Sequence, residues 1–385
     1  MSIQPFTIDV PQATLDDLHE RLIRTRWPDE IEGAGWEYGT NFAYLKSLVQ
    51  YWLHGFNWRE QEAKLNRFAH FRAQIGNMGI HFVHERGKGP HPLPLIITHG
   101  WPGSFFELLK LVPLLTDPAS YGGDPADAFD VIVPSLPGFG FSDQPRERGW
   151  TLAQTAELWM HLMKEELGYQ RFAAAGGDFG SGVTRMLALR HPELVVGIHL
   201  TFLSFPTLIA DMPDLSPAEQ RYLEAVQQWM SREGGYAMIQ STKPQTLAYG
   251  LNDSPVGLAG WIIEKFQSLS DCGGEIERSF SKDELLTNIM IYWVTQSINA
   301  SIRTYYENVR LQPPLRAGQR IEVPAGVALF PGEANRPPRE WGERTLHIER
   351  WSEMPRGGHF AGLEAPDLLA DELRTFFRPL RSALP

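Results

Sequence analysis

The chain carries, at residues 175–180, the stretch Ala175-Gly176-Gly177-Asp178-Phe179-Gly180. The apolar run at residues 171–175 predicts a buried strand before Asp178, and residues 181–189 predict a helix after it. A strand, a tight turn with glycine on both sides and a helix together form a nucleophile elbow, which exposes one side chain on a strained turn. The stretch therefore predicts that Asp178 is an exposed nucleophile.

Aspartate at this position predicts a different chemistry from the usual serine. Serine attacks substrates that already contain a carbonyl group. A carboxylate can instead displace a leaving group from saturated carbon, and the resulting ester supplies a carbonyl for water to attack. Asp178 thus indicates epoxides or alkyl halides as substrates. The competing interpretation is an aspartate in a plain glycine-rich turn. It would be preferred for the turn alone, but the residues described below supply the partners that a nucleophile requires.

The composition narrows the class of protein. A formal net charge of -11 over 385 residues, without a basic cluster, argues against nucleic acid and anionic membranes as partners. Cys272 is the only cysteine, which excludes an internal disulfide and a cysteine-built zinc site. Residues 1–6 show no signal-peptide pattern, and no apolar run reaches the ~20 residues of a membrane helix. We therefore expect a soluble, cytoplasmic protein without a membrane anchor.

The order of strand and helix patterns predicts an α/β protein with four parts. Residues 1–90 are expected to form an N-terminal helical meander and the first hairpin strands, and residues 91–204 the first half of an α/β core. Residues 205–315 read as an inserted helical lid, because the strand pattern stops there. Residues 316–385 complete the core, whose central sheet is expected to be mostly parallel and flanked by helices.

The individual elements follow from periodicity and turn residues. Strands are predicted at residues 68–75, 80–85, 93–98, 129–134, 171–175, 194–200, 323–330 and 346–350. Helices are predicted from residue 14 to before residue 26, where residues 14–17 resemble a capping box, and at residues 44–53, 58–68, 105–115, 151–167, 181–189, 217–231, 256–269, 282–309 and 366–378.

A general base is expected late in the chain, since the elbow fold orders its triad as nucleophile, acid and base. His359 lies in Arg356-Gly357-Gly358-His359-Phe360, where two glycines let the backbone bend so that the imidazole reaches over the sheet. His347, inside the last strand pattern, is the weaker competitor. His359 is therefore the predicted base.

The acid that orients the base is expected directly after the strand at residues 323–330. Glu333 follows that strand in Phe330-Pro331-Gly332-Glu333, at the edge where such sheets present functional groups. Glu340 and Glu343 are close in sequence, but their spacing is typical of a solvated helix. We predict Glu333 as the acid.

Residues 99–104 (HGWPGS) follow the strand at 93–98 and match the HG-type loop of an oxyanion hole. The predicted donors are the backbone N–H groups of Trp101 and Phe179. His99 has no partner at metal-ligand spacing, and His81 and His84 point to opposite faces of a strand. No metal or cofactor is predicted.

Opening an epoxide also requires a donor for the departing oxygen, and tyrosine hydroxyls in a lid suit this task. Spacing alone does not choose among the tyrosines at Tyr222, Tyr236, Tyr249, Tyr292, Tyr305 and Tyr306.

Taken together, these segments resemble the microsomal-type epoxide hydrolases, a branch of the α/β-hydrolase superfamily. The resemblance runs from about Pro5 to Phe377 and rests on HGWPGS (99–104), PSLPGFGFS (134–142), GGDFG (176–180), LNDSPVGLAGWIIEKF (251–266), FPGE (330–333) and RGGHF (356–360). It implies an α/β-hydrolase fold with a helical lid and an N-terminal meander. Animal members carry a membrane anchor, whereas this chain begins directly with the meander.

The resemblance also implies roles for single residues. Asp178 would be the nucleophile, Glu333 the charge-relay acid and His359 the base. Tyr236 would be one lid donor and Tyr305 the other, with Tyr306 as the adjacent alternative. The implied enzyme is a hydrolase acting on ether bonds. It converts a small-molecule epoxide and water into a vicinal diol through a covalent aspartyl ester, without cofactor or metal.

Other interpretations stay open at this point. A haloalkane dehalogenase shares the aspartate–histidine–acid logic, but it often has tryptophan after the nucleophile, where this chain has Phe179. A catalytically silent ligand-binding relative is another alternative. Such proteins commonly lack one triad member, whereas this chain has Asp178, His359 and Glu333. Substrate contacts are expected at Trp101, Phe179, Trp261 and Trp293, which favour a bulky or aromatic epoxide. Both a detoxifying and a natural-product biosynthetic role are compatible with this prediction, and the resemblance leaves a homodimer open.

Overall fold

A central sheet organises the protein, for which a computed structural model describes residues 3–203, 214–311, 319–334 and 336–383. Among these residues nine strands form one sheet in the order β1-β2-β3-β5-β4-β6-β7-β8-β9. The strands are β1 Ile3–Pro5, β2 His70–Ile75, β3 Met78–Glu85, β4 Leu93–Thr98, β5 Phe129–Pro134, β6 Phe172–Gly176, β7 Val195–Leu200, β8 Ile321–Leu329 and β9 Leu346–Glu353. Three pairs are antiparallel: β1 with β2, β2 with β3, and β3 with β5. The other five pairs are parallel: β5 with β4, β4 with β6, β6 with β7, β7 with β8, and β8 with β9.

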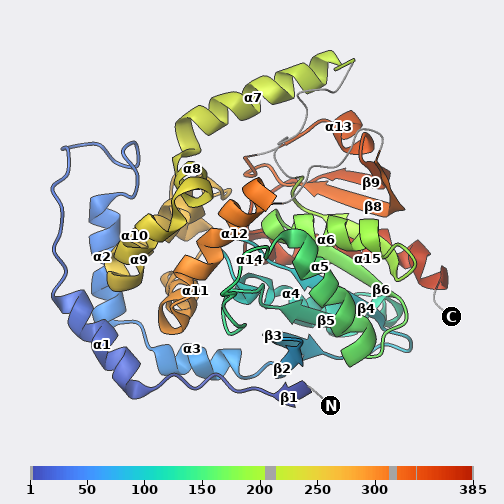
Figure 1. Cartoon of the computed structure of the whole chain (residues 1–385), viewed down its shortest axis with the longest axis horizontal. Helices are drawn as coiled ribbons and strands as arrows, with labels where there is room; N and C mark the ends of the chain where they lie inside the picture. The colour runs from blue at the N-terminus through green and yellow to red at the C-terminus, as the bar shows by residue number, and fades with distance from the viewer. Residues whose placement is uncertain (1–2, 204–213, 312–318, 335, 384–385) are drawn as a thin grey trace.

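Helices cover both faces of the sheet (Figure 1). They are α1 Gln12–Ile23, α2 Phe42–His54, α3 Trp58–Leu65, α4 Leu111–Thr116, α5 Leu152–His161, α6 Asp178–Arg190, α7 Pro217–Glu233, α8 Gly235–Thr242, α9 Pro244–Asp253, α10 Pro255–Ser268, α11 Lys282–Thr295, α12 Ile298–Leu311, α13 Arg339–Glu343, α14 Ala361–Glu364 and α15 Pro366–Phe377. Short 3-10 helices occur at Phe105–Leu108, Pro118–Tyr121, Pro125–Asp127, Ile276–Arg278 and Arg378–Ala383, and a π-helical turn at Leu162–Glu166.

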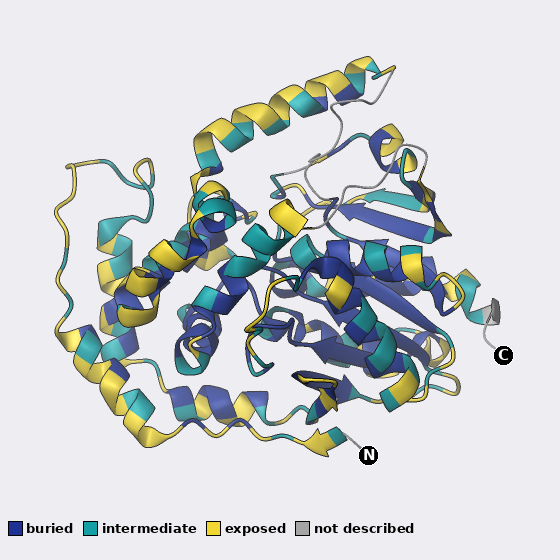
Figure 2. Cartoon of the chain, in the orientation of Figure 1, coloured by how far each residue is buried: buried dark blue, intermediate teal, exposed yellow. Residues whose placement is uncertain are grey.

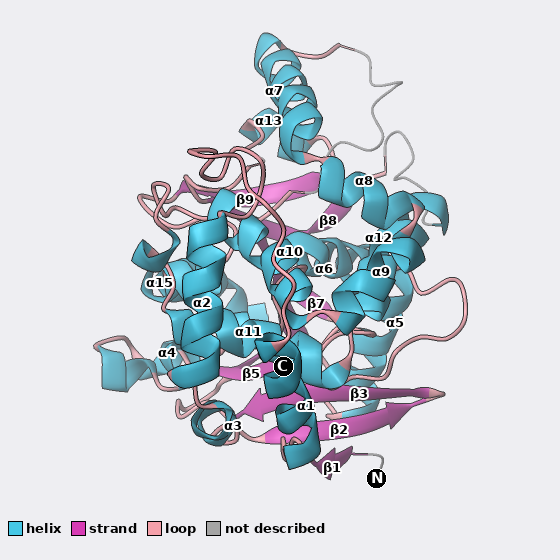
Figure 3. Ribbon diagram, turned by 90° about the vertical axis from the view of Figure 1, so that its left-hand side faces the viewer, coloured by secondary structure: helices cyan, strands magenta, loops and turns pink. Residues whose placement is uncertain are grey.

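The layers follow from the apolar character of the strands. Every residue of β4, β5, β6 and β7 is buried, as expected for parallel strands that are covered on both faces. Figure 3 shows α4 and α15 on one side of the sheet and α5 on the other. The central strands β3 to β7 form the dark-blue interior of Figure 2, whereas α7 is mostly exposed, with only Glu219 and Tyr222 buried.

The lid is built from α7 to α12, all of which lie between β7 and β8 in the chain. Helix α12 packs against α8 and α9, and α10 packs against α9 and α11. On its outer side α10 also contacts α1 and α2, so that the meander supports the lid (Figure 1). Among the helices that the structure describes, none is long and apolar enough to span a membrane.

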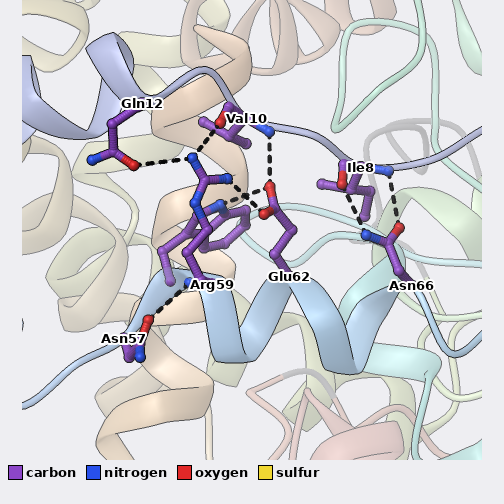
Figure 4. Close-up of polar contacts among 8 residues, drawn as sticks. Ile8, Val10, Gln12, Asn57, Arg59, Glu62 and Asn66 are labelled. Atoms are coloured by element: carbon purple, nitrogen blue, oxygen red, sulfur yellow. Dashed lines mark hydrogen bonds and ion pairs between the residues drawn. The ribbon is translucent and has the colours of Figure 1, made fainter.

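Residues 6–11, which we call the N-terminal strap, connect β1 to α1 and lie along α3 (Figure 4). The backbone N–H of Ile8 donates to Asn66 Oδ1 at 2.9 Å, and Asn66 Nδ2 donates to the carbonyl of Ile8 at 2.8 Å. The N–H of Val10 donates to Glu62 Oε1 at 2.8 Å, and Arg59 Nη2 donates to the carbonyl of Val10 at 2.7 Å. Side chains of α3 and of its C-cap residue Asn66 thus satisfy the backbone of Ile8 and Val10, which belong to neither a helix nor a strand.

The strands at residues 93–98 and 129–134 have the predicted bounds, and the hairpin turns at residues 76–77 between β2 and β3. The predicted capping box at residues 14–17 is wrong, because α1 begins at Gln12 after Pro11, without a side-chain cap. Proline fits the N-terminal boundary of a helix, since the first N–H groups have no intrahelical partner. Thr14 is therefore inside the first turn.

Two predicted helices are interrupted. Residues 105–115 form a 3-10 helix and then α4, because Pro113 lacks an N–H group and tolerates only the first turn of α4. Residues 282–309 divide into α11 and α12 at Gln296, whose φ of 52 ends α11 in the left-handed conformation. The sequence patterns missed β1, α8, α9 and α14, which are short or begin beside glycine or proline.

Candidate active site

The turn between β6 and α6 presents the carboxylate of Asp178. Its φ of 44 lies in the left-handed region, which costs energy for a residue with a side chain. The turn is possible because its neighbours are glycines. A Cβ at Gly176 would overlap the backbone of Gly180, and a Cβ at Gly180 would overlap the carbonyl of Thr98. The strained turn therefore has the form of a nucleophile elbow.

The two oxygens of Asp178 have different surroundings. Oδ1 accepts the backbone N–H of Trp101 at 2.8 Å, and the backbone N–H of Phe179 also bonds to this carboxylate. Gly100 lets this loop approach, since a Cβ there would overlap the carboxylate. Burial raises the pKa of Asp178, while the charge of His359 and the two N–H groups lower it. The donors that the HG-type loop predicted thus lie at the carboxylate.

The imidazole of His359 faces the second oxygen. His359 Nε2 lies 3.8 Å from Asp178 Oδ2, and Nδ1 lies 2.8 Å from Glu333 Oε2. The backbone N–H of His359 is fixed by the carbonyl of Leu269 at 2.9 Å. Burial alone lowers the pKa of His359, but the nearby carboxylates of Glu333 and Asp178 raise it to about 10. The ring is therefore held in one orientation by Glu333 and carries a proton at neutral pH.

The competing acids and base lie elsewhere. His347 is exposed on β9, with Nδ1 3.2 Å from the carbonyl of Glu322. Glu340 and Glu343 are exposed on α13, as the sequence predicted. None of these three contributes to the cluster around Asp178.

Two lid tyrosines lie close to the residues that surround Asp178. The ring of Tyr236 stacks on Trp101, with centroids 5.4 Å apart and planes at 13°. Tyr305 packs edge-on against Phe179 at 4.8 Å and against Trp101 at 5.8 Å. The hydroxyl groups of Tyr236 and Tyr305 are hydrogen bonded to each other. Burial and the charge of Asp178 raise the pKa of both phenols, so they stay neutral donors at pH 7.

The other candidate tyrosines have separate environments. Tyr306 lies beneath Arg310, whose guanidinium carbon is 5.3 Å from the ring centroid. Tyr292 is buried and donates to the carbonyl of Gly103 at 2.6 Å. Tyr222 packs against Trp341 at 5.1 Å, and Tyr249 is exposed. Of the adjacent pair, it is thus Tyr305 rather than Tyr306 whose ring meets Trp101 and Phe179.

The predicted substrate contacts at Trp261 and Trp293 are placed on the lid helices α10 and α11. Trp261 Nε1 donates to Gln240 Oε1 at 2.9 Å. Trp293 lies beneath Arg21 of α1, whose guanidinium carbon is 5.8 Å from the ring centroid. These contacts fix both indoles within the protein, and their role toward substrate stays a prediction.

Comparison with known proteins identifies the family. Residues 3–108 match the family model described as the N terminus of epoxide hydrolases, and residues 94–233 match the alpha/beta hydrolase fold. A putative epoxide hydrolase of Stigmatella aurantiaca is 48% identical over 382 residues, which cover 99% of this chain and 86% of that protein. The chain belongs to the epoxide hydrolases.

Other members of this family support the assignment. Epoxide hydrolase 1 of Oryctolagus cuniculus is 40% identical over 408 residues, covering 97% of this chain and 88% of that protein. The crystal structure of juvenile hormone epoxide hydrolase from the silkworm Bombyx mori superposes with a TM-score of 0.88 at 29% identity, covering 99% of this chain and 95% of that one. The protein is therefore an epoxide hydrolase with an α/β-hydrolase fold.

The site of this epoxide hydrolase contains a further carboxyl group, that of Glu107, which the sequence analysis did not predict. Glu107, Asp178 and His359 line the same small cavity. Its volume of about 20 Å³ is enough for one water molecule. Burial and the charge of Asp178 raise the pKa of Glu107 to about 8, although His359 and the N–H of Gly100 lower it. The only sequence signal was an acid inside the apolar run after HGWPGS.

Within residues 3–203, 214–311, 319–334 and 336–383, no three histidine, cysteine, aspartate or glutamate side chains are arranged to hold a metal ion. Asp178, His359, Glu333 and Glu107 instead form a cluster of three carboxyl groups around one imidazole.

Proposed function

We propose that this epoxide hydrolase opens its substrate by attack of Asp178 and hydrolyses the resulting ester with water activated by His359. The observation that carries the proposal is the asymmetry of the nucleophile. Oδ1 is held by the N–H of Trp101 at 2.8 Å, whereas Oδ2 is 3.8 Å from His359 Nε2. One oxygen is thus prepared to become an oxyanion, and the other is available to attack.

In the first step Asp178 Oδ2 attacks a ring carbon of the epoxide, and the carbon–oxygen bond of the ring breaks. Tyr236 and Tyr305 hold the departing oxygen, and one of them transfers its proton to it. The product is an ester between Asp178 and the substrate, with a free hydroxyl on the neighbouring carbon. Support for this step comes from the position of both phenols beside Trp101 and Phe179.

Ester formation removes the negative charge of Asp178, and this changes His359. In the resting enzyme that charge helps to raise the pKa of His359. When the charge of Asp178 is lost, the pKa of His359 falls. The imidazolium then transfers its proton to the tyrosinate that was formed when the tyrosine protonated the epoxide oxygen. His359 then becomes a neutral base just when the second step requires one.

In the second step His359 takes a proton from water, and the hydroxide attacks the ester carbonyl carbon. The negative charge develops on Oδ1, opposite the N–H groups of Trp101 and Phe179. The bond between the carbonyl carbon and Oδ2 breaks, so that Oδ2 leaves with the substrate as an alkoxide, and the proton of the new carboxylic acid passes to it. Asp178 is again a carboxylate and His359 again protonated, so one epoxide and one water have become one diol.

The surroundings favour a bulky or aromatic epoxide. Trp101, Tyr236, Tyr305 and Phe179 contact one another through their rings beside the nucleophile. Aromatic rings offer a large apolar surface for packing, so these four side chains suit a substrate with a ring or a branched chain next to the epoxide.

An intact-mass experiment tests the proposal. The His359→Gln variant is incubated with a panel of epoxides and alkyl halides, and Asp178→Ala/His359→Gln serves as the control. A gain equal to a whole epoxide that disappears in the control is the expected result. A gain equal to an alkyl group without its halide, and none with epoxides, would indicate a dehalogenase. Diol formation without any adduct would contradict the covalent mechanism.

A further inference from the structure

Lys265 on α10 is a buried charged residue that the proposed mechanism does not use. Only 3% of its side chain is exposed. The ammonium lies 2.7 Å from Glu264 Oε2 and 3.6 Å from Glu233 Oε2. It also lies over the ring of Tyr236, 4.6 Å from the centroid. An ammonium is costly to bury, so its position on this ring requires an explanation.

The ring of Tyr236 is held by two partners of different kinds. Trp101, whose backbone binds Asp178, stacks on it at 5.4 Å. The ammonium of Lys265 contacts the same ring, and such a cation is attracted by the electrons of the aromatic face. Lys265 therefore restrains the phenol that faces the nucleophile.

The charges around Tyr236 are otherwise unfavourable for its task. After burial, the carboxylates of Asp178, Glu333 and Glu264 are the causes that raise the pKa of Tyr236, whereas the hydrogen bond with Tyr305 lowers it. Each of these carboxylates opposes negative charge on the phenol oxygen. Lys265 is the cation in contact with the ring, and its ion pair with Glu264 offsets one of the three.

We propose that Lys265 is a positioning residue for ring opening, which holds Tyr236 against Trp101 and screens it from Glu264 and Glu233. Tyr236 can then accept the negative charge that develops as the epoxide opens. Lys265 acts through Tyr236 and does not touch the substrate. This inference rests on the proposed function, in which Tyr236 donates to the epoxide oxygen.

Three substitutions separate charge from packing. Lys265→Met keeps an unbranched apolar chain and removes the ammonium. Lys265→Arg keeps a cation that can lie over an aromatic ring. Lys265→Met/Glu264→Gln removes both members of the closest ion pair, so that Glu264 is not left without its cation, and only the more distant Glu233 loses its contact with Lys265. The matched control is Lys46→Met, because the exposed Lys46 lies over the ring of Phe42 at 4.7 Å in the meander.

The measurement is single-turnover kinetics with excess enzyme, in which quenched samples give the rates of ester formation and ester hydrolysis separately. We expect Lys265→Met to slow ester formation about tenfold or more, and to change ester hydrolysis by less than about threefold. Lys265→Arg and Lys265→Met/Glu264→Gln should each recover part of the lost rate. Lys46→Met should match the parent enzyme in both steps.

A double-mutant cycle with Tyr236→Phe decides whether Lys265 acts through the phenol. If it does, Lys265→Met has little further effect once the Tyr236 hydroxyl is absent. Equal slowing of both steps without recovery by arginine would show a purely structural role and overturn the inference. An unchanged rate of ester formation in Lys265→Met, with Tyr236→Phe slow, would overturn the inference alone. Normal ester formation in Tyr236→Phe would instead overturn the assigned role of Tyr236 in the proposed function.

Discussion

Two shielded carboxylates, Glu62 beneath the N-terminal strap and Asp178 at the elbow, are satisfied in opposite ways. Glu62 Oε1 accepts from the N–H of Val10 at 2.8 Å and from Trp58 Nε1 at 3.1 Å, and Oε2 accepts from Arg59 at 2.6 Å (Figure 4). Both oxygens of Glu62 therefore have donors, and one donor carries the opposite charge.

Asp178 Oδ1 accepts the N–H of Trp101 at 2.8 Å, while His359 Nε2 lies 3.8 Å from Oδ2. Glu333 and Glu107 add further carboxyl groups to the same space. A fully satisfied charge contributes to stability, whereas a crowded and partly free one costs stability but can react. The comparison teaches that the two carboxylates differ in the completeness of their hydrogen bonding, and the proposed mechanism uses the incompletely bonded one.

The largest expected effect is the loss of activity in Asp178→Ala. Without the nucleophile, the turnover of an epoxide substrate should fall on the order of 10⁴-fold. The melting temperature should stay the same or rise, because burial raises the pKa of Asp178 and its charge is costly in the fold. Steady-state kinetics and thermal unfolding of the purified variant measure both. Substantial turnover in the variant, or a strong loss of stability, would contradict the claim that Asp178 serves the reaction and not the stability of the fold.

The opposite outcome is expected for Glu62→Ala. The N–H of Val10 and the indole of Trp58 lose their acceptor, so the free energy of unfolding should fall by about 2–4 kcal/mol. Activity per folded molecule should not change. Urea unfolding is compared with Glu20→Ala, which removes an exposed ion pair with Arg24 at 3.4 Å and should cost less than about 1 kcal/mol. Equal losses in the two variants would argue against the role of Glu62.

Two adjacent tyrosines on α12, Tyr305 and Tyr306, are expected to differ in their effect on ester formation. Tyr305 contacts Phe179 at 4.8 Å, whereas Tyr306 lies under Arg310. Tyr305→Phe should slow ester formation about 100-fold, because one donor to the epoxide oxygen is lost. Tyr306→Phe should leave it unchanged. Rapid-quench kinetics of both variants measure this, and a larger effect at Tyr306 would reverse the assignment.

A smaller effect is expected in the pH dependence of stability. His359 has an ordinary pKa of 6.5 and, through Glu333 and Asp178, a pKa of about 10 in the folded protein. Its contribution to the free energy of unfolding is therefore complete below pH 6.5 and is lost as the pH rises toward 10. The slope for one proton is about 1.4 kcal/mol per pH unit.

Urea unfolding from about pH 9 upward isolates this contribution, since Glu107, with a pKa of about 8, has lost most of its proton by that pH. The parent protein should lose stability with rising pH more steeply than His359→Gln. Parallel curves for the two proteins would show that Glu333 and Asp178 do not hold a proton on His359.

The comparison also shows what a sequence can predict. β4, β5 and the turn at Asp178 were found because an apolar run and flanking glycines act locally. The place of Glu333 followed from the end of a parallel strand. Glu107 was missed because its elevated pKa arises from burial among residues distant in the chain. Pro113 and Gln296 divided predicted helices because an apolar period does not reveal where backbone hydrogen bonding stops.

The central claim is that a carboxylate oxygen of Asp178 becomes part of the diol. Single turnover in H₂¹⁸O with excess enzyme tests it directly, with mass spectrometry of the diol and of the peptide that contains Asp178. The account predicts an unlabelled diol from the first turnover and ¹⁸O in Asp178. Label in the first diol, with none in Asp178, would mean that water attacks the epoxide directly and would contradict the account.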